Sequence, residues 1–268
     1  MAETRYAVVT GGNKGIGFEI CKQLASQGVT VVLTARDEKK GNEAVEKLVK
    51  DSGISDKNLI FHQLDVMDPN SIATLVEFIN SKFGKLDILV NNAGIGGIIV
   101  EGDVSVLHET IMESALSMTG QEVPEMKSTG KIVYTYDLAE ECLKTNYYGP
   151  KQLAEAFISL MQSSPSPRIV NISSSMGKLA LLSNEWAKRV LSDGENLTAE
   201  RVDEVVAQFL KDFKEGTAEA KGYCRTDITC SNGFLTSAEG AEAPVMLALL
   251  PNGGPSGSYF LGKEVTTY

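Results

Sequence analysis

The chain has 268 residues, a length that suits one large α/β domain better than two small ones. Hydrophobic residues make up 43% of the sequence, which is enough for a sizeable buried core. The formal net charge of −10 argues against nucleic acid or an anionic membrane surface as a partner.

The cysteines and histidines are scattered along the chain, at Cys21, Cys142, Cys224, Cys230, His62 and His108. None has the paired spacing of metal ligands, and the cysteines are typical of reduced thiols in the cytoplasm. The N-terminal sequence MAETRYAVV lacks the apolar core of a signal peptide, and no apolar run approaches the ~18 residues that span a membrane. We therefore expect a cytoplasmic protein with no metal site and no membrane partner.

The stretch Tyr6–Gly17, YAVVTGGNKGIG, predicts a strand, a glycine turn and the start of a helix. A dinucleotide-binding βαβ unit opens in this way. Gly11 allows the tight turn, Gly15 lets the backbone approach a pyrophosphate, and Gly17 lets the first helical turn pack on the sheet. The phosphates would meet unpaired N–H groups and the positive end of the helix dipole. The alternative is a turn with a purely structural role.

The spacing T-G-x-x-x-G-x-G, together with Asn91-Asn92-Ala93-Gly94 further on, resembles the short-chain dehydrogenase/reductase family. In that family the second motif braces the central sheet and lines the ribose of the cofactor. The resemblance implies cofactor contacts from the two motifs, at Gly11, Asn13, Lys14, Gly15, Ile16, Gly17, Asn91, Ala93 and Gly94.

A second strand is predicted at 30–34, and Arg36 and Asp37 follow it. An acidic residue at this strand tip accepts the ribose 2′-hydroxyl in NAD enzymes, whereas an arginine suits the 2′-phosphate of NADP. Arg36 occupies the tip, Lys14 in the glycine turn adds a positive charge, and Asp37 is expected to point away. NADP(H) is therefore favoured over NAD(H). The alternative is that both cations are solvated surface charges.

The alternation continues with a charged helix at 38–50, a strand at 58–66 and a strand at 86–90. It predicts an α/β fold with a doubly wound, mostly parallel, Rossmann-like sheet in a single domain, 1–268. Ligands of such sheets lie beyond the carboxyl ends of the strands, where the glycine turn, Arg36, Asp65 and Asn91 are found. By resemblance, Asp65 and Val66 touch the adenine ring. Asp68, just before a proline, predicts a helix N-cap.

Residues 96–137 break this rhythm, and we interpret them as an insertion at the edge of the sheet. Their methionines, Met112, Met118 and Met126, favour core packing over substrate contact. With the stretch Tyr136–Asn146, the insertion resembles the plant branch of the family that contains salutaridine reductase, neomenthol and menthone reductases and isopiperitenone reductase, near the carbonyl reductases. In that branch the insertion covers the helix face that other members use to oligomerise, which implies a monomer.

Two residues have catalytic roles by resemblance. Asn146, within a predicted long helix, matches the asparagine that holds a water in the family's proton relay. Ser174 ends a strand predicted at 168–174 and precedes Gly177 in the family's S-x-x-G pattern, so it aligns with the catalytic serine. It would bind the carbonyl oxygen of the substrate and position it for hydride attack. A serine hydrolase is excluded because the G-x-S-x-G motif is missing.

The family's Tyr-x-x-x-Lys pair, whose lysine lowers the pKa of the tyrosine, is expected on the helix after Ser174. Tyr147 and Lys151 have this spacing, but they precede Ser174 and enclose a Gly-Pro pair, so we interpret them as a chance match. After Lys221-Gly222 the sequence passes directly to Tyr223, where relatives carry the catalytic helix and a strand. About 40 residues, the size of one supersecondary unit, are therefore predicted to be deleted near residue 222. The fold would lack one helix and one strand.

Beyond this point Thr226 matches, by resemblance, the threonine that contacts the nicotinamide carboxamide. Helices are predicted at 199–213 and 239–250, and the last strand at 258–261.

The sequence thus predicts an NADPH-dependent oxidoreductase that reduces a ketone or enone of a small hydrophobic metabolite, of terpenoid or alkaloid type, by hydride transfer. The alternative is a catalytically silent NADP-binding splice variant or truncated relative, because the catalytic tyrosine and lysine are missing. A third interpretation, an extended-type sugar-nucleotide epimerase, conflicts with the three residues between the first two motif glycines.

Overall fold

The computed structural model describes residues 4–107, 109–110, 128–174, 177–179, 182, 184–217 and 236–266, and the chain divides into two compact units. The sheet unit comprises Met1–Gly94, Lys144–Ser173 and Leu235–Thr267. The second unit comprises Ile95–Leu143, Ser174–Phe234 and Tyr268. A single domain over 1–268 stays a prediction.

The sheet unit is built on a parallel sheet whose order is β3-β2-β1-β4-β7. Its strands are β1 (Tyr6–Val9), β2 (Thr30–Ala35), β3 (Leu59–Gln63), β4 (Ile88–Asn91) and β7 (Arg168–Asn171), and a short 3₁₀ turn, η1 (Asp56–Asn58), precedes β3. The chain winds outward in both directions from β1 and β4. This reversal is the position where open α/β sheets bind their ligands.

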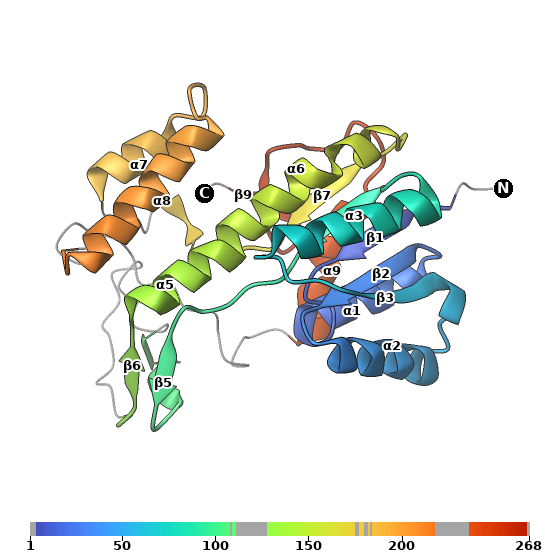
Figure 1. The fold of residues 1–268 in the computed structure, drawn as a ribbon, viewed down its shortest axis with the longest axis horizontal. Helices are drawn as coiled ribbons and strands as arrows, with labels where there is room; N and C mark the ends of the chain where they lie inside the picture. The colour runs from blue at the N-terminus through green and yellow to red at the C-terminus, as the bar shows by residue number, and fades with distance from the viewer. Residues whose placement is uncertain are drawn as a thin grey trace. The chain divides into compact units, whose positions relative to one another are not determined.

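Helices cover both faces of this sheet (Figure 1). The first layer is α1 (Gly15–Ser26), α2 (Glu38–Ser52) and α9 (Ser237–Ala248), and the second is α3 (Pro69–Phe83) and α6 (Gly149–Gln162). Strand residues alternate between the two cores, with Val31 and Leu33 in the first and Val32 in the second. The parallel sheet is thus buried on both faces, as expected for this class of fold. The predicted doubly wound, Rossmann-like α/β fold is confirmed.

The first turns of two helices follow from their local sequence. Asp37 caps α2 by accepting a hydrogen bond from the Lys40 N–H at 2.9 Å. Asp68 caps α3 by accepting one from the Asn70 N–H at 2.9 Å, with Pro69 at the start of the helix. The predicted N-cap at Asp68 is confirmed.

Within the described residues the sheet ends at β7, so its second half, β4 and β7, has one strand fewer than its first half. Dinucleotide-binding sheets of this type are built from two halves of three strands. On β7 the side chain of Ile169 is 46% exposed, whereas inner strands of parallel sheets are covered on both faces. The predicted loss of one strand from this side of the sheet stays a prediction.

The strand predicted at 258–261 forms, but it is neither the last strand nor part of this sheet. It is β8 (Tyr259–Leu261), which pairs antiparallel with β9 (Glu264–Thr266) in a separate two-stranded sheet. The pairing is local because Gly262, with φ of +60°, reverses the chain and leaves Leu261 opposite Glu264. The residue types therefore predicted a strand correctly but not its partner.

In the second unit, β5 (Ile99–Glu101) pairs antiparallel with β6 (Lys131–Val133). The described residues of this unit also form the helices α5 (Tyr136–Leu143), α7 (Glu185–Ser192) and α8 (Ala199–Lys214). The predicted helix at 199–213 is confirmed as α8. The insertion at 96–137 stays a prediction, and Met112, Met118 and Met126 lie outside the described residues.

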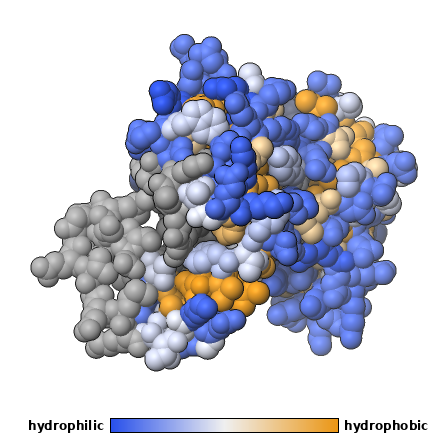
Figure 2. Space-filling model, turned by 60° about the vertical axis from the view of Figure 1, so that its left-hand side comes forward, coloured by the Kyte–Doolittle hydropathy of each residue, from blue (hydrophilic) through white to orange (hydrophobic). Residues whose placement is uncertain are grey.

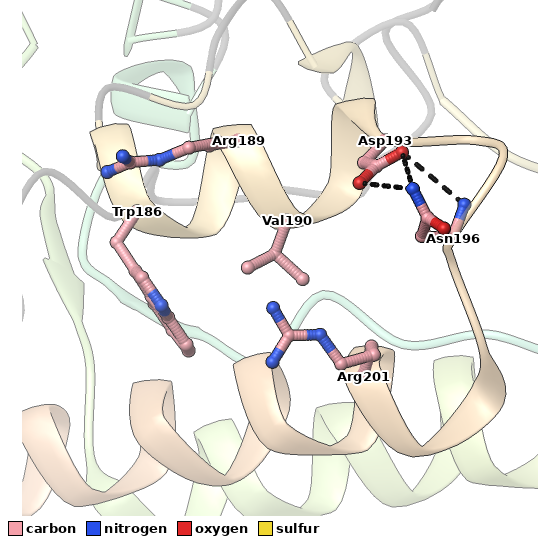
Figure 3. A pocket seen from close by; sticks show the side chains of 6 residues that line it. All are labelled: Trp186, Arg189, Val190, Asp193, Asn196 and Arg201. Carbon is pink, nitrogen blue, oxygen red and sulfur yellow. Dashed lines mark hydrogen bonds between the residues drawn. The ribbon is translucent and has the colours of Figure 1, made fainter.

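A cavity of about 400 Å³ lies beside α7 and α8 (Figure 3). Its lining residues are Trp186, Arg189, Val190, Asp193, Asn196 and Arg201. The Asp193 carboxylate accepts bonds from the Asn196 side-chain amide at 3.0 and 3.1 Å, and Arg201 pairs with Glu204 at 2.7 Å. Since two of its charged groups already have partners, we assign no ligand to this cavity.

Figure 2 shows a mostly hydrophilic surface with separate hydrophobic areas. The most exposed large hydrophobic side chains include Val265 at 62%, Val104 at 59% and Ile158 at 57%. They lie on different elements and do not define one interface. No helix in the described part of the chain is long and apolar enough to span a membrane.

Phe157 on α6 is fully buried in the second core layer, so its replacement by alanine should leave a cavity. We expect Phe157→Ala to lower the free energy of unfolding by about 3–5 kcal/mol. The neighbouring Ile158 is 57% exposed, and Ile158→Ala should change it by about 0.5 kcal/mol or less. Denaturant unfolding followed by circular dichroism compares the two, and equal losses would contradict this packing.

Candidate functional site

The glycine turn joins β1 to α1 at the carboxyl edge of the sheet. Gly11 and Gly15 have φ values of +63° and +57°, a backbone conformation that favours glycine. A Cβ on Gly15 would meet nothing within 4 Å, and Lys14 at the N-cap of α1 makes no side-chain capping bond. The first N–H groups of α1 and the positive end of its dipole therefore face an open backbone cradle. Such a cradle fits a pyrophosphate.

Gly17 has a different role from the predicted one of packing on the sheet. A Cβ there would lie 2.4 Å from Nδ2 of Asn92 and 2.6 Å from the carbonyl oxygen of Gly11. The first turn of α1 is thus packed against the loop that follows β4, and this loop requires the glycine.

The Thr10 side chain joins the glycine turn to that loop. Its hydroxyl oxygen accepts hydrogen bonds from the N–H groups of Asn92 and Ala93, both at 2.9 Å. The Asn92 side-chain amide donates in return to the carbonyl oxygens of Thr10 at 2.8 Å and Gly11 at 3.2 Å. Thr10 and Asn92 were not among the site residues predicted from the sequence. The threonine before the first motif glycine and the doubled asparagine were the available signals.

The remaining predicted cofactor residues of the two motifs lie in the same segments, at Asn13, Ile16, Ala93 and Gly94. The structure therefore brings the two motifs together at one edge of the sheet.

Arg36 is exposed directly after β2, close in the chain to a contact with the glycine turn. That contact is the bond from the Gly12 N–H to the Thr34 carbonyl at 2.9 Å. Lys14 in the turn is also exposed. Asp37 uses its carboxylate to cap α2, as described above, so this acid is occupied by the helix.

Asp65 and Val66 lie beyond β3, which is shorter than the predicted strand. Oδ1 of Asp65 accepts a bond from the Met67 N–H at 2.9 Å, which forms a turn, and Val66 is buried. Arg36 and Asp65 line one cavity of about 550 Å³, together with His62, Gln63, Asp68, Asn70, Ser71 and Thr74. Two residues predicted independently at strand tips thus share one concave surface.

Asn91 ends β4 and is 4% exposed. Its Nδ2 donates to Oδ1 of Asn171 at 2.8 Å, whereas its own Oδ1 is buried without a hydrogen-bond donor among the described residues. A buried acceptor without a donor costs free energy unless a ligand or water supplies one. The position therefore fits a cofactor hydroxyl.

Asn146 lies in a π-helical segment, η2 (Lys144–Tyr148), between α5 and α6, and not in a regular α-helix as predicted. Pro150 has no N–H, so the α-helical bond to the Asn146 carbonyl cannot form. Single π-helical turns within helices occur often at functional sites. Asn146 is exposed, and its segment belongs to the sheet unit.

Ser174 is exposed after β7, and its carbonyl accepts a bond from the Gly177 N–H at 2.9 Å. The S-x-x-G pattern thus forms a local turn. Ser174 belongs to the second unit, unlike Asn146. Tyr223 and Thr226 lie outside the described residues.

The Tyr-x-x-x-Lys spacing occurs twice, once before and once after the position expected for the catalytic pair. Tyr147 and Lys151 contact each other, with the ammonium 5.8 Å from the ring centroid. A second pair with this spacing, Tyr259 and Lys263, was not identified from the sequence. It spans the β8–β9 turn instead of a helix, and Lys263 pairs with Glu242 at 2.8 Å. Neither pair lies on a helix between β7 and α9.

Burial raises the pKa of the Cys21 thiol, so Cys21 stays protonated and inert in the core. No cluster of three metal-ligating side chains exists among the described residues.

The hydroxyl of Thr10 is the bond acceptor that holds the loop after β4. Thr10→Val keeps the shape but leaves the Asn92 and Ala93 N–H groups without an acceptor, and should lower the free energy of unfolding by about 2 kcal/mol. Thr10→Ser retains the hydroxyl and should lose less than half as much. Thermal and denaturant unfolding measure both, and equal effects would show that the methyl group matters instead.

The comparisons with known proteins agree with this geometry. A family model described as short chain dehydrogenase matches residues 5–138. The (+)-neomenthol dehydrogenase of Capsicum annuum is 52% identical over 308 aligned positions, covering 99% of this chain and 98% of that protein. Salutaridine reductase of Papaver somniferum is 44% identical, covering 100% and 97%. The solved structure of menthone neomenthol reductase from Mentha piperita has a TM-score of 0.88 at 49% identity, covering 98% of this chain and 100% of that one.

The first of these comparisons also bears on the length of the chain. Its 308 positions exceed the 268 residues here by 40, so at least 40 positions of the relative have no counterpart. This equals the size predicted for the deletion, whose place near residue 222 stays a prediction. From the sheet order, the paired motifs and similarity along its whole length, the chain belongs to the short-chain dehydrogenase family of oxidoreductases.

Proposed function

We propose that this chain binds NADP(H) and that its activity, where the catalytic segment is present, is reduction of a carbonyl. The substrate would be a ketone or enone on a small hydrophobic metabolite of terpenoid or alkaloid type. The names of the similar neomenthol dehydrogenase and salutaridine reductase support these two substrate classes. The resemblance described above further supports a monomer, and the scattered cysteines support a cytoplasmic location.

The observation that carries the cofactor proposal is that two neighbouring residues after β2, Arg36 and Asp37, have different roles. Arg36 is exposed at the strand tip, where a 2′-phosphate would lie, while the acid that could bind a 2′-hydroxyl, Asp37, caps α2. A guanidinium suits a phosphate through charge and paired N–H donors. Lys14 adds a second positive charge in the glycine turn.

The other residues have complementary roles. The cradle at Gly11 to Gly17 would hold the pyrophosphate, and Asn91 would accept a bond from a ribose hydroxyl. When bound, NADPH supplies the hydride. Ser174 would hold the carbonyl oxygen of the substrate, Asn146 would hold a water that relays protons, and Thr226 would contact the nicotinamide.

A second candidate function is nucleotide binding without turnover. It is favoured by the sequence, in which no Tyr-x-x-x-Lys pair lies on a helix between β7 and α9, and by the 40-position difference from the Capsicum annuum relative. Without the tyrosine no general acid would protonate the reduced carbonyl oxygen. The two candidates share the binding site and differ only in chemistry.

The Arg36→Ala variant tests the cofactor proposal. Loss of a charge-assisted phosphate contact should raise the Kd for NADPH about 10- to 100-fold and change the Kd for NADH less than twofold. Lys39→Ala is the matched control, because Lys39 is a nearby surface cation that does not line the cavity. Fluorescence titration of both dinucleotides measures this. An NADH-preferring wild-type chain would overturn the proposal.

Restoring the deleted segment distinguishes the two candidate functions. We expect the 268-residue chain to oxidise NADPH with a panel of cyclic ketones about 10²–10⁴ times more slowly than a chimaera that carries the corresponding segment of the Capsicum annuum relative after Gly222. The rate is followed by NADPH absorbance. Equal rates in the two proteins would exclude the silent alternative.

A further inference from the structure

The tip of β2, which carries Arg36, is attached to β3 by a side chain outside the two sequence motifs. In the parallel register, Ala35 lies opposite Gln63, and the Leu64 N–H donates to the Ala35 carbonyl at 3.0 Å. One residue further, the side-chain Nε2 of Gln63 donates to the Arg36 carbonyl at 2.9 Å. Gln63 therefore adds a bond between the strands just where the backbone ladder ends.

The backbone on the other side of Arg36 is also held. The Asp37 carboxylate caps α2, and the Asp37 carbonyl accepts the Gly41 N–H at 3.0 Å as the first bond of that helix. Arg36 thus lies between a helix that begins at once and a strand that has just ended. In this short stretch the Gln63 amide bonds the Arg36 carbonyl to the end of β3.

The charged groups around Arg36 make its position important for phosphate binding. The same cavity that Arg36 lines is also lined by the carboxylates of Asp65 and Asp68. A phosphate in this cavity would be repelled by the acids and attracted by the guanidinium, so its binding depends on which of them is nearer. If the backbone of Arg36 shifted, its guanidinium could pair with one of the two carboxylates instead of the phosphate.

We propose that Gln63 is a positioning residue for cofactor selection: its side-chain amide, bonded to the Arg36 carbonyl, holds Arg36 where it meets the 2′-phosphate of NADP(H). The inference rests on the proposed function and adds a residue whose role is to hold Arg36 in place. Gln63 acts through Arg36, so its effect must disappear when Arg36 is removed.

Two variants at this position and one matched control test it. Gln63→Leu keeps much of the size and removes the donor, and Gln63→Glu keeps the length but cannot donate when ionised. Gln23 is the control, because Nε2 of this half-buried glutamine likewise donates to a backbone carbonyl, that of Ala238, at 3.0 Å toward the far end of α1. Gln23→Leu therefore removes the same kind of bond elsewhere.

The readout is the Kd of NADPH and of NADH by fluorescence titration of the full chain. Gln63→Leu should raise the Kd for NADPH about three- to tenfold, Gln63→Glu at least as much, and neither should change the Kd for NADH more than twofold. In an Arg36→Ala background, Gln63→Leu should change the Kd for NADPH less than twofold. Gln23→Leu should leave both constants and their ratio unchanged.

Several outcomes overturn the proposal. Equal weakening of NADPH and NADH by Gln63→Leu would indicate a general structural role, and a persistent effect without Arg36 would indicate a direct contact. Unchanged selectivity in Gln63→Leu, with a wild-type chain that prefers NADPH, would remove the positioning role and leave the proposed function standing. A wild-type chain that binds neither dinucleotide would remove both.

Discussion

The hydroxyl of Thr10 connects the two strands from which the sheet diverges. It accepts the N–H groups of Asn92 and Ala93 at 2.9 Å, and the Asn92 amide returns two bonds to the glycine turn. Thr10 is 1% exposed, so these bonds form away from water, where an unpaired polar group is costly. The turn after β1 and the loop after β4 are therefore one structure. Every cofactor contact proposed for the two motifs depends on it.

Of the three helices that follow β1, β2 and β3, the first begins differently from the other two, and this difference concerns anion binding at the helix N-terminus. Asp37 and Asp68 neutralise the first turns of α2 and α3, so those helix ends have protein partners. α1 begins at a glycine after Lys14, without a side-chain cap or an acid in its first turn. A negative ligand is thus favoured at α1 and disfavoured at its neighbours. The same capping removes Asp37 from competition with Arg36.

The elements that are determined by a few neighbouring residues were predicted correctly from the sequence. The β-branched run of β2 and the Asp-Pro start of α3 formed as expected because burial and capping act over a few residues. The π-helical turn at Asn146 was missed, since a missing N–H at Pro150 does not show how the chain will adjust. The partner of β8 and the bond from Gln63 to Arg36 depend on residues far apart in the chain, which one sequence does not pair.

The order of the sheet separates binding from chemistry. Apart from Thr226, the proposed cofactor contacts come from the ends of β1, β2 and β3 and from the end of β4 and the loop after it, on strands that are paired and covered by helices. The catalytic tyrosine and lysine of the family would come from the segment after β7, where the described part of the sheet ends and Ile169 is 46% exposed. The deletion predicted at that end would remove a general acid and an outer strand but no residue of the glycine turn. Turnover could therefore be lost without loss of binding, because the cofactor contacts proposed for the two motifs precede β7 in the chain, whereas the catalytic pair would follow it.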